Sequence, residues 1–292
     1  MNDDLRVVYE SRNRAECSDR ALVLASLRIP YQIVDDMDSC ALIVPAQYSA
    51  QAMDQLIQYD DENLPTIVRK PTAIQYQNAV PGLIGYALVV CGVALLAGFS
   101  VSNSEWITAG RVDGVLIRAG EWWRTITALT LHSGPRHIVS NLVFGALFGL
   151  FAGRLLGSGV AWLAIVLAAA TGNVLNTMLL DSAHRAVGAS TAVFAALGLL
   201  AGYVWRGKLM AQDRWPYRVG PIVGGFALLM YTGTGGENTD VGAHLMGFLC
   251  GLGGGILLSP LRARLVSPKL QAVSGLVAIA IVCGAWIAAL QS

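Results

Sequence analysis

The sequence predicts an all-α polytopic membrane protein with seven spanning helices, preceded by a small cytosolic α/β domain. Of its 292 residues, 54% are hydrophobic and only 13% are charged, whereas a soluble domain usually carries about 25% charged residues. The 20 basic and 19 acidic residues leave a net charge of +1. Because a nucleic-acid-binding protein normally presents a strongly basic surface, this balance excludes nucleic acid as a partner.

The N-terminal region differs in composition from the rest of the chain, because most acidic residues lie between Asp3 and Glu62. Short β-forming runs and helical stretches follow one another there in the order β-α-β-β-α. The runs lie at 6–9, 31–34 and 41–44, and the helical stretches lie near 13–27 and 47–60. Residues 1–70 are therefore expected to form a small cytosolic domain, with Pro65 and Pro71 in the linker. It carries no phosphate-binding loop or catalytic cluster, so it is either regulatory or a merely folded appendage.

The membrane region is divided by its charges, since a spanning helix needs about 20 apolar residues. Seven stretches lack any Asp, Glu, Lys or Arg: 71–104, 137–153, 155–180, 186–205, 219–236, 241–261 and 270–292. We expect a six-span core over 71–261, followed by a cytosolic linker and a seventh spanning helix over 262–292.

The orientation follows from the basic residues that flank these spans, because Lys and Arg are retained on the cytoplasmic side. If the N-terminus lies inside, ten basic residues flank the inner ends and five lie in the outer segments. The sequence therefore predicts a cytoplasmic N-terminus and, after seven spans, a C-terminus outside.

Four polar residues stand near the outer heads of the even-numbered spans: His137, Asn141, Ser190 and His244. Polar side chains within a span are costly unless they face a cavity, so such residues indicate function. Asn141, Ser190 and His244 each follow the nearest outer charge by four or five residues, roughly 6–8 Å along a helix. His137 precedes Asn141 by four residues and so shares its helical face. We expect the four side chains to meet in one outward-facing pocket.

The spacing of small residues supports this convergence. Gly198 and Gly202 follow Ser190, and Gly247, Gly251 and Gly255 follow His244. Small residues four apart allow two membrane helices to approach closely. A His beside a Ser can take the hydroxyl proton and make the Ser a nucleophile. His137, Asn141 and the Ser190 amide could then stabilise an oxyanion.

Four segments together resemble the motifs of the rhomboid family of intramembrane serine proteases. They are Glu121-Trp-Trp-Arg124, His132-Ser-Gly-Pro-Arg-His137-Ile-Val-Ser-Asn141, Gly188-Ala-Ser190-Thr191 and Ala243-His244-Leu-Met-Gly247-Phe-Leu-Cys-Gly251. The resemblance covers roughly 80–260, and it leaves the N-terminal domain and the seventh span unexplained.

This resemblance implies a site of known composition. Ser190 would be the nucleophile and His244 the base, with His137, Asn141 and the Ser190 amide at the oxyanion hole. Structural support would come from Gly188, Phe194, Gly247, Gly251, Trp123 and Arg124. Phe194 stands where many members have Tyr, and it would keep the surface that stacks under the catalytic His. We expect Trp122, Trp123 and Arg124 to anchor the long outer loop at the lipid interface.

The family cleaves single-pass membrane proteins in or near their transmembrane segment, and it uses no metal and no organic cofactor. A bacterial inner membrane is the expected location. The sequence itself contains no HExxH zinc motif and no pair of membrane aspartates, and its five cysteines have no metal-ligand spacing.

Two other classes of function remain open at this stage. The chain could be a catalytically inactive rhomboid-like protein that binds membrane helices, or a transporter that uses His137, Asn141 and His244 as a polar relay. Transporters usually contain repeated halves or broken helices, and no internal repeat is visible. The sequence indicates neither the substrate nor the oligomeric state.

Overall fold

The computed structural model describes residues 4–36, 39–63, 76–98, 104–179, 184–207, 209, 215–233 and 239–292. The chain divides into two compact units, Met1–Arg69 and Lys70–Ser292. The expected linker residues Pro65 and Pro71 lie outside the described residues.

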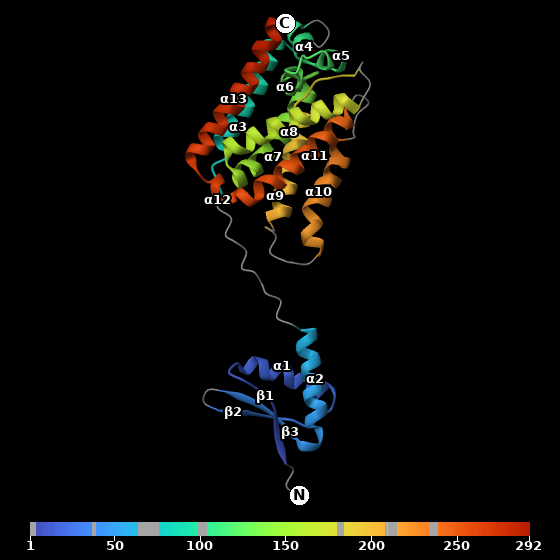
Figure 1. Cartoon of the computed structure of the whole chain (residues 1–292), viewed down its shortest axis with the longest axis vertical. Helices are drawn as coiled ribbons and strands as arrows, with labels where there is room; N and C mark the ends of the chain where they lie inside the picture. The colour runs from blue at the N-terminus through green and yellow to red at the C-terminus, as the bar shows by residue number, and fades with distance from the viewer. Residues whose placement is uncertain are drawn as a thin grey trace. The chain divides into compact units, whose positions relative to one another are not determined.

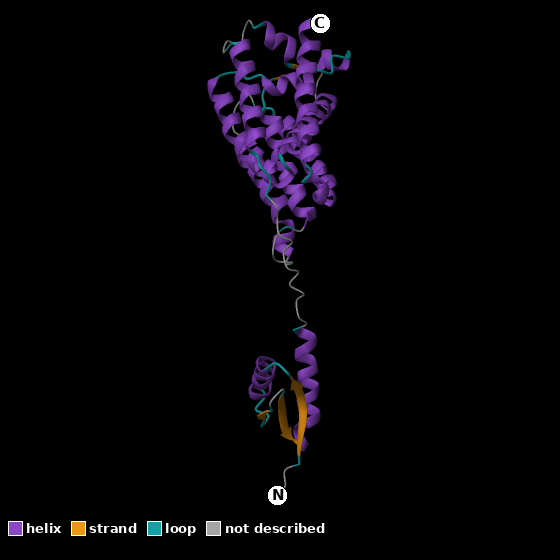
Figure 2. Ribbon diagram, turned by 90° about the vertical axis from the view of Figure 1, so that its left-hand side faces the viewer, coloured by secondary structure: helices purple, strands orange, loops and turns teal. Residues whose placement is uncertain are grey.

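The first unit contains a three-stranded antiparallel sheet with two helices (Figure 2). Its elements are β1 (Leu5–Ser11), α1 (Arg14–Ser26), β2 (Gln32–Asp35), β3 (Cys40–Pro45), the 3-10 turn η1 (Ala46–Tyr48) and α2 (Ser49–Glu62). The strand order is β1-β3-β2. Alternate residues of β3 are buried, and Leu42 and Val44 pack with Leu24 of α1 and Leu56 of α2. Both helices therefore cover the same face of the sheet.

The second unit is a helical bundle, with the short helices α4, α5 and α6 at one end (Figure 1). Its elements are α3 (Val80–Ala97), α4 (Glu105–Gly110), β4 (Val112–Asp113), α5 (Gly114–Arg118), α6 (Arg124–Thr127), η2 (Ala128–Thr130), α7 (Pro135–Leu156), α8 (Ser158–Leu179), β5 (Arg185–Ala186), α9 (Ser190–Gly207), α10 (Trp215–Gly233), α11 (Val241–Leu258), η3 (Ser259–Leu261), α12 (Arg262–Leu265) and α13 (Pro268–Gln291).

In the part of this unit that the structure describes, five stretches are long and apolar enough to cross a membrane, which makes the chain a multi-pass membrane protein. They are α3, α7, α8, α13 and the stretch Val241–Leu265 that begins with α11. Among the described residues, the expected spans at 186–205 and 219–236 form α9 and α10, which are not among these five. The apolar part of α10 is the shorter stretch Val219–Tyr231. More than half of the residues of α9 are buried by neighbouring helices.

The contact between α9 and α11 is built from glycine, as the spacing of small residues predicts. A Cβ atom added at Gly251 would collide with the carbonyl oxygen of Ala195, and one added at Gly255 would collide with that of Leu199. Gly198 of α9 makes the corresponding contact from the other helix, because a Cβ atom added there would collide with the carbonyl oxygen of Phe248 in α11. The two helices therefore touch backbone to backbone, and this holds the N-terminal turns of α9 and α11 in fixed positions.

Candidate active site

Ser190 is the first residue of α9 and is partly exposed. The segment that leads to it is held by a short antiparallel pair, in which Val112 of β4 lies opposite Ala186 of β5. Arg185 strengthens this pair, because its Nε donates to Oδ2 of Asp113 at 3.0 Å. The Ser190 hydroxyl therefore lies at the N-terminus of α9, shortly after a strand whose position is fixed by this pairing.

Gly188 brings Ser190 and His137 together. A Cβ atom at Gly188 would lie 2.6 Å from Cε1 of the His137 ring and 3.5 Å from the Ser190 Oγ. The backbone of Gly188 has φ of +145°, which disfavours any residue with a side chain. Its N–H donates to the carbonyl of Ala128 at 3.0 Å. Glycine is therefore required here both by conformation and by space.

The His137 ring presents an N–H on the side that faces Gly188. The backbone N–H of Ser133 donates to Nδ1 of His137 at 3.4 Å, and the Ser133 hydroxyl lies 2.9 Å from the same nitrogen. Because a backbone N–H can only donate, Nδ1 is the acceptor, so the neutral ring carries its proton on Nε2. A Cβ at Gly188 would lie 2.8 Å from this Nε2.

His244 lies over the part of α9 that carries Ser190. Its side chain is only 6% exposed, and its ring centroid is 4.5 Å from that of Phe194 at an interplanar angle of 39°. Phe194 follows Ser190 by four residues and so occupies the same face of α9, one turn further in. Gly247 allows this approach, because a Cβ there would lie 2.5 Å from the carbonyl oxygen of Thr191. The rings of Phe194 and His244 are thus in contact, tilted against each other.

Asn141 provides a buried amide with spare donor capacity. It is 5% exposed, and its Nδ2 has no hydrogen-bond partner within the described part of the chain. Its backbone carbonyl accepts a 2.7 Å bond from the Tyr86 hydroxyl of α3. The Tyr86 ring in turn stacks on Trp162 of α8, with centroids 4.7 Å apart. A buried unsatisfied donor is rare in proteins, and this one lies on α7 one turn after His137, so its Nδ2 is free to donate to a negatively charged or carbonyl oxygen.

Asp240 links three segments at the head of α11. It caps the helix, because its Oδ1 accepts from the Ala243 N–H at 2.9 Å. Its Oδ2 also lies 2.7 Å from Nε2 of His184, and both oxygens accept from Asn176 of α8 at 3.1 Å. His184 shows no signal in the sequence, because its partner lies 56 residues away.

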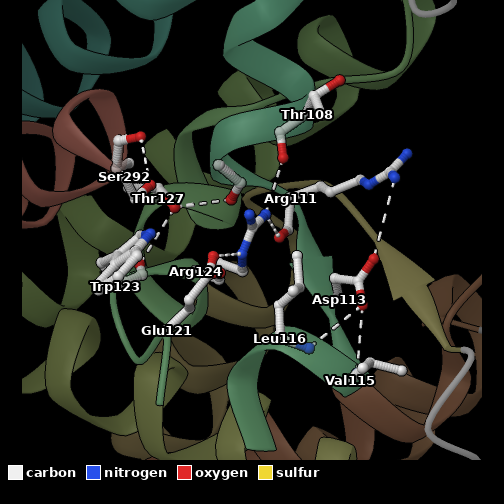
Figure 3. A network of polar contacts seen from close by, with 12 residues as sticks. Thr108, Arg111, Asp113, Val115, Leu116, Glu121, Trp123, Arg124, Thr127 and Ser292 are labelled. Atoms are coloured by element: carbon white, nitrogen blue, oxygen red, sulfur yellow. Dashed lines mark hydrogen bonds and ion pairs between the residues drawn. The ribbon is translucent and has the colours of Figure 1, made fainter. Parts of the chain in front are cut away.

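Arg124 corrects one expectation about the outer loop (Figure 3). Its side chain is 5% exposed and lies inside the loop, where Nε donates to Glu121 Oε2 at 2.6 Å. One NH group donates to the carbonyls of Thr108 at 2.8 Å and Arg111 at 3.2 Å. The expected anchoring of Arg124 at the lipid interface is therefore wrong, because these three partners compensate for its burial. Trp123 is likewise partly buried and packs inward.

Two titratable groups of the outer segments are strongly influenced by their surroundings. Burial, together with the neighbouring His137 ring, lowers the pKa of His132 to about 4. Burial raises the pKa of Asp113, but the hydrogen bond from Arg185 and the backbone N–H groups of Leu116 and Val115 outweigh it, so the pKa is below its ordinary value. His132 is therefore neutral and Asp113 ionised at neutral pH.

A small cavity of about 20 Å³ lies beside Ser190, and this volume is sufficient for one water molecule. Asn173, Thr191 and Asp240 line it together with Gly188 and Ser190. Within the described ranges, no group of three or more His, Cys, Asp or Glu side chains is arranged to hold a metal ion.

The fold and the site together define a class: a multi-pass membrane protein in which Ser, His and Asn side chains gather at the ends of neighbouring helices. The Rhomboid domain matches residues 119–261. The chain belongs to the rhomboid family.

The relatives are named as proteases. “Rhomboid protease GluP” of Bacillus subtilis (strain 168) is 26% identical over 204 residues, which are 68% of this chain and 35% of GluP. “Putative rhomboid protease YdcA” of the same organism is 36% identical over 143 residues, 48% of this chain and 67% of that protein. “Rhomboid-like protease 3” of Toxoplasma gondii is 35% identical over 133 residues, 44% of this chain and 49% of that protein. The chain thus spans about a third of the length of GluP.

Proposed function

We propose that the chain is an intramembrane serine endopeptidase that hydrolyses peptide bonds in or near the transmembrane segment of membrane protein substrates. The observation that carries this proposal is the contact of His244 with Phe194, one turn below Ser190 on the same face of α9. This contact puts an imidazole near the N-terminus of α9, where the Ser190 hydroxyl lies beside Gly188.

The chemistry follows from the positions of these groups. Ser190 Oγ attacks the scissile carbonyl while His244 takes its proton, and His244 then returns a proton to the leaving amine. The oxyanion accepts hydrogen bonds from His137 Nε2–H, Asn141 Nδ2 and the Ser190 amide at the N-terminus of α9. Water then hydrolyses the acyl-enzyme, and the cavity beside Ser190 has room for one such molecule. This is a Ser-His dyad without a carboxylate, and it requires no metal or organic cofactor.

The proposed topology places this site near the outer surface of a bacterial inner membrane. A cytoplasmic N-terminus puts residues 1–70 in the cytosol, six spans over 71–261 and the C-terminus outside. The excess of basic residues at the inner flanks supports this orientation. Single-pass membrane proteins are the proposed substrates, since their helices reach the site from the bilayer.

The decisive experiment compares the detergent-purified full chain with Ser190→Ala and His244→Ala on a fluorogenic transmembrane peptide. We expect Ser190→Ala to lower kcat by as much as about 10⁶-fold while the protein remains folded, because the nucleophile is removed. Ser158→Ala is the matched control, since Ser158 is likewise the first residue of a helix, α8. A fluorophosphonate probe should label the native chain and not Ser190→Ala.

Cleavage that survives in Ser190→Ala would disprove the assignment of the nucleophile. If the native chain is folded yet neither cleaves the peptide nor reacts with the probe, the endopeptidase proposal fails. The catalytically inactive reading, in which the protein binds membrane helices, would then replace it.

A further inference from the structure

The last helix, α13, lies outside the matched Rhomboid domain yet is fixed to the bundle at both ends. At its start, the Gln271 side chain donates to the carbonyls of Leu156 at 2.8 Å and Leu265 at 2.6 Å. The Gln271 Oε1 accepts from the Val160 N–H at 3.1 Å. Gly159 of α8 leaves room for the backbone of α13 at the same level. This end of α13 therefore has a defined position against α7 and α8.

The other end of α13 is fixed through Trp286, which contacts Thr130 of η2 and Trp106 of α4. Figure 1 shows the C-terminal end of α13 at the same end of the bundle as α4. Trp286 is 7% exposed, and its indole Nε1 donates to Thr130 Oγ1 at 3.0 Å. Its ring lies against Trp106 of α4, with centroids 4.8 Å apart. A Cβ at Gly110 would lie 2.6 Å from the indole, so a glycine is needed to seat the ring. The indole is thus both packed and hydrogen-bonded.

Thr130 belongs to the short turn η2, which also touches the segment before Ser190. The Thr130 hydroxyl donates to the Thr127 carbonyl at 2.8 Å, and this closes the turn. Two residues earlier, the Ala128 carbonyl accepts the Gly188 N–H at 3.0 Å. One turn of three residues therefore contacts α13 on one side and the Gly188–Ser190 segment on the other.

The same turn leads to the histidine pair. Leu131, which is almost fully buried, packs in one cluster with Trp286. His132 follows it, and its ring lies edge-on to His137 with centroids 5.2 Å apart. A shift of η2 would therefore move the supports of both Gly188 and His137.

We infer that Trp286 is a positioning residue of the active site, and that α13 holds η2 in a fixed position relative to the segment Gly188–Ser190. This inference rests on the proposed function. Trp286 does not touch the substrate; it acts through Thr130, Ala128 and Gly188. Loss of its hydrogen bond lets η2 move, and small displacements of reacting groups cost large factors in rate.

The test uses the purified full chain with Trp286→Phe, Thr130→Val and the double variant. Trp286→Phe keeps an aromatic ring and loses the donor. We expect kcat to fall about tenfold in each single variant with KM changed less than about twofold, because positioning affects the transition state and not substrate binding. The double variant should be no slower than Thr130→Val alone, since that substitution already removes the bond that Trp286→Phe breaks. Melting temperatures should stay close to that of the native chain.

Trp205→Phe is the matched control, because Trp205 lies toward the other end of α9 and is 37% exposed. It should leave kcat at the native value. Unchanged kcat in Trp286→Phe would overturn the inference, as would a loss in kcat that is additive in the double variant and proportional to a drop in melting temperature. That second pattern is the signature of a purely structural role.

Hydrogen exchange makes the test independent of catalysis. The Gly188 amide donates to Ala128, so its exchange should become faster in Trp286→Phe and stay unchanged in Trp205→Phe. If the native chain does not cleave any peptide, the proposed function fails, while faster exchange at Gly188 still supports the link from α13 to η2. Unchanged exchange in Trp286→Phe would contradict that link whatever the activity.

Discussion

The α9–α11 contact and the contact of α7 with α3 and α8 both depend on glycine, but the glycines face different partners. In the α9–α11 contact, Gly251 lies against the carbonyl of Ala195. In the α7 contact, Gly145 lies against the Tyr86 ring and Gly149 lies against the Trp162 ring, at 2.5 Å from an added Cβ. The first contact is backbone on backbone, and the second is backbone on aromatic side chain.

This difference determines how precisely each half of the site is held. A backbone carbonyl moves only if its helix moves. The distance between α9 and α11 is therefore fixed, and with it the positions of Ser190 and His244. An aromatic ring can turn or shift at modest cost. The half that carries His137 and Asn141 therefore depends on side chains that can adjust.

The largest effect is expected for Gly251→Ala in the backbone contact. The new methyl group would collide with the Ala195 carbonyl, and relief requires α9 and α11 to separate. We expect a loss of unfolding free energy of about 3 kcal/mol or more, at the upper end of overpacking effects, together with loss of cleavage. Unfolding in mixed micelles with increasing SDS measures the stability. A variant with native stability and native kcat would show that the two helices are not in rigid contact.

A second prediction concerns the pH dependence of the loop that supports His137. The pKa of His132 is about 4 in the fold because of burial and the nearby His137, and about 6.5 in the unfolded chain. The unfolded state therefore binds the proton first, and stability falls as the pH drops from about 6.5 toward 4. By pH 5 the loss should be about 2 kcal/mol. His132→Phe should remove this part of the slope, and an identical slope in both proteins would contradict the prediction.

A smaller effect is expected for Gly149→Ala in the aromatic contact. The methyl group would lie 2.5 Å from the Trp162 ring, which can turn away. We expect a loss of about 1–2 kcal/mol by overpacking and retention of most activity. The ratio to Gly251→Ala in the same SDS titration is the decisive quantity. Equal losses in the two variants would remove the distinction between rigid and adjustable contacts.

The sequence predicted the first contact better than the second, for a physical reason. Glycines four apart lie on one face of one helix, so Gly247 and Gly251 indicate a close approach without knowledge of the partner. Ser190, His244, His137 and Asn141 were predicted in the same way, from spacing and depth within single helices. Tyr86 and Trp286 gave no such signal, because their partners Asn141 and Thr130 lie 55 and 156 residues away. The position expected for Arg124 was wrong because the carbonyl groups that accept its hydrogen bonds belong to the backbone. A pattern of side chains in the sequence does not indicate such partners.

The smallest effect, and the one of opposite sign, is expected for Gly253→Ala. Gly253 lies on α11 two residues from Gly251, but on a face where an added Cβ has nothing within 4 Å among the described residues. Alanine favours a helix over glycine by about 0.5–1 kcal/mol, so this variant should be slightly more stable and fully active. The pair Gly251→Ala and Gly253→Ala differs only in the face that receives the methyl group. A loss of stability in Gly253→Ala would mean that α11 tolerates no side chain on either face, and that the collision with Ala195 is not what makes Gly251 necessary.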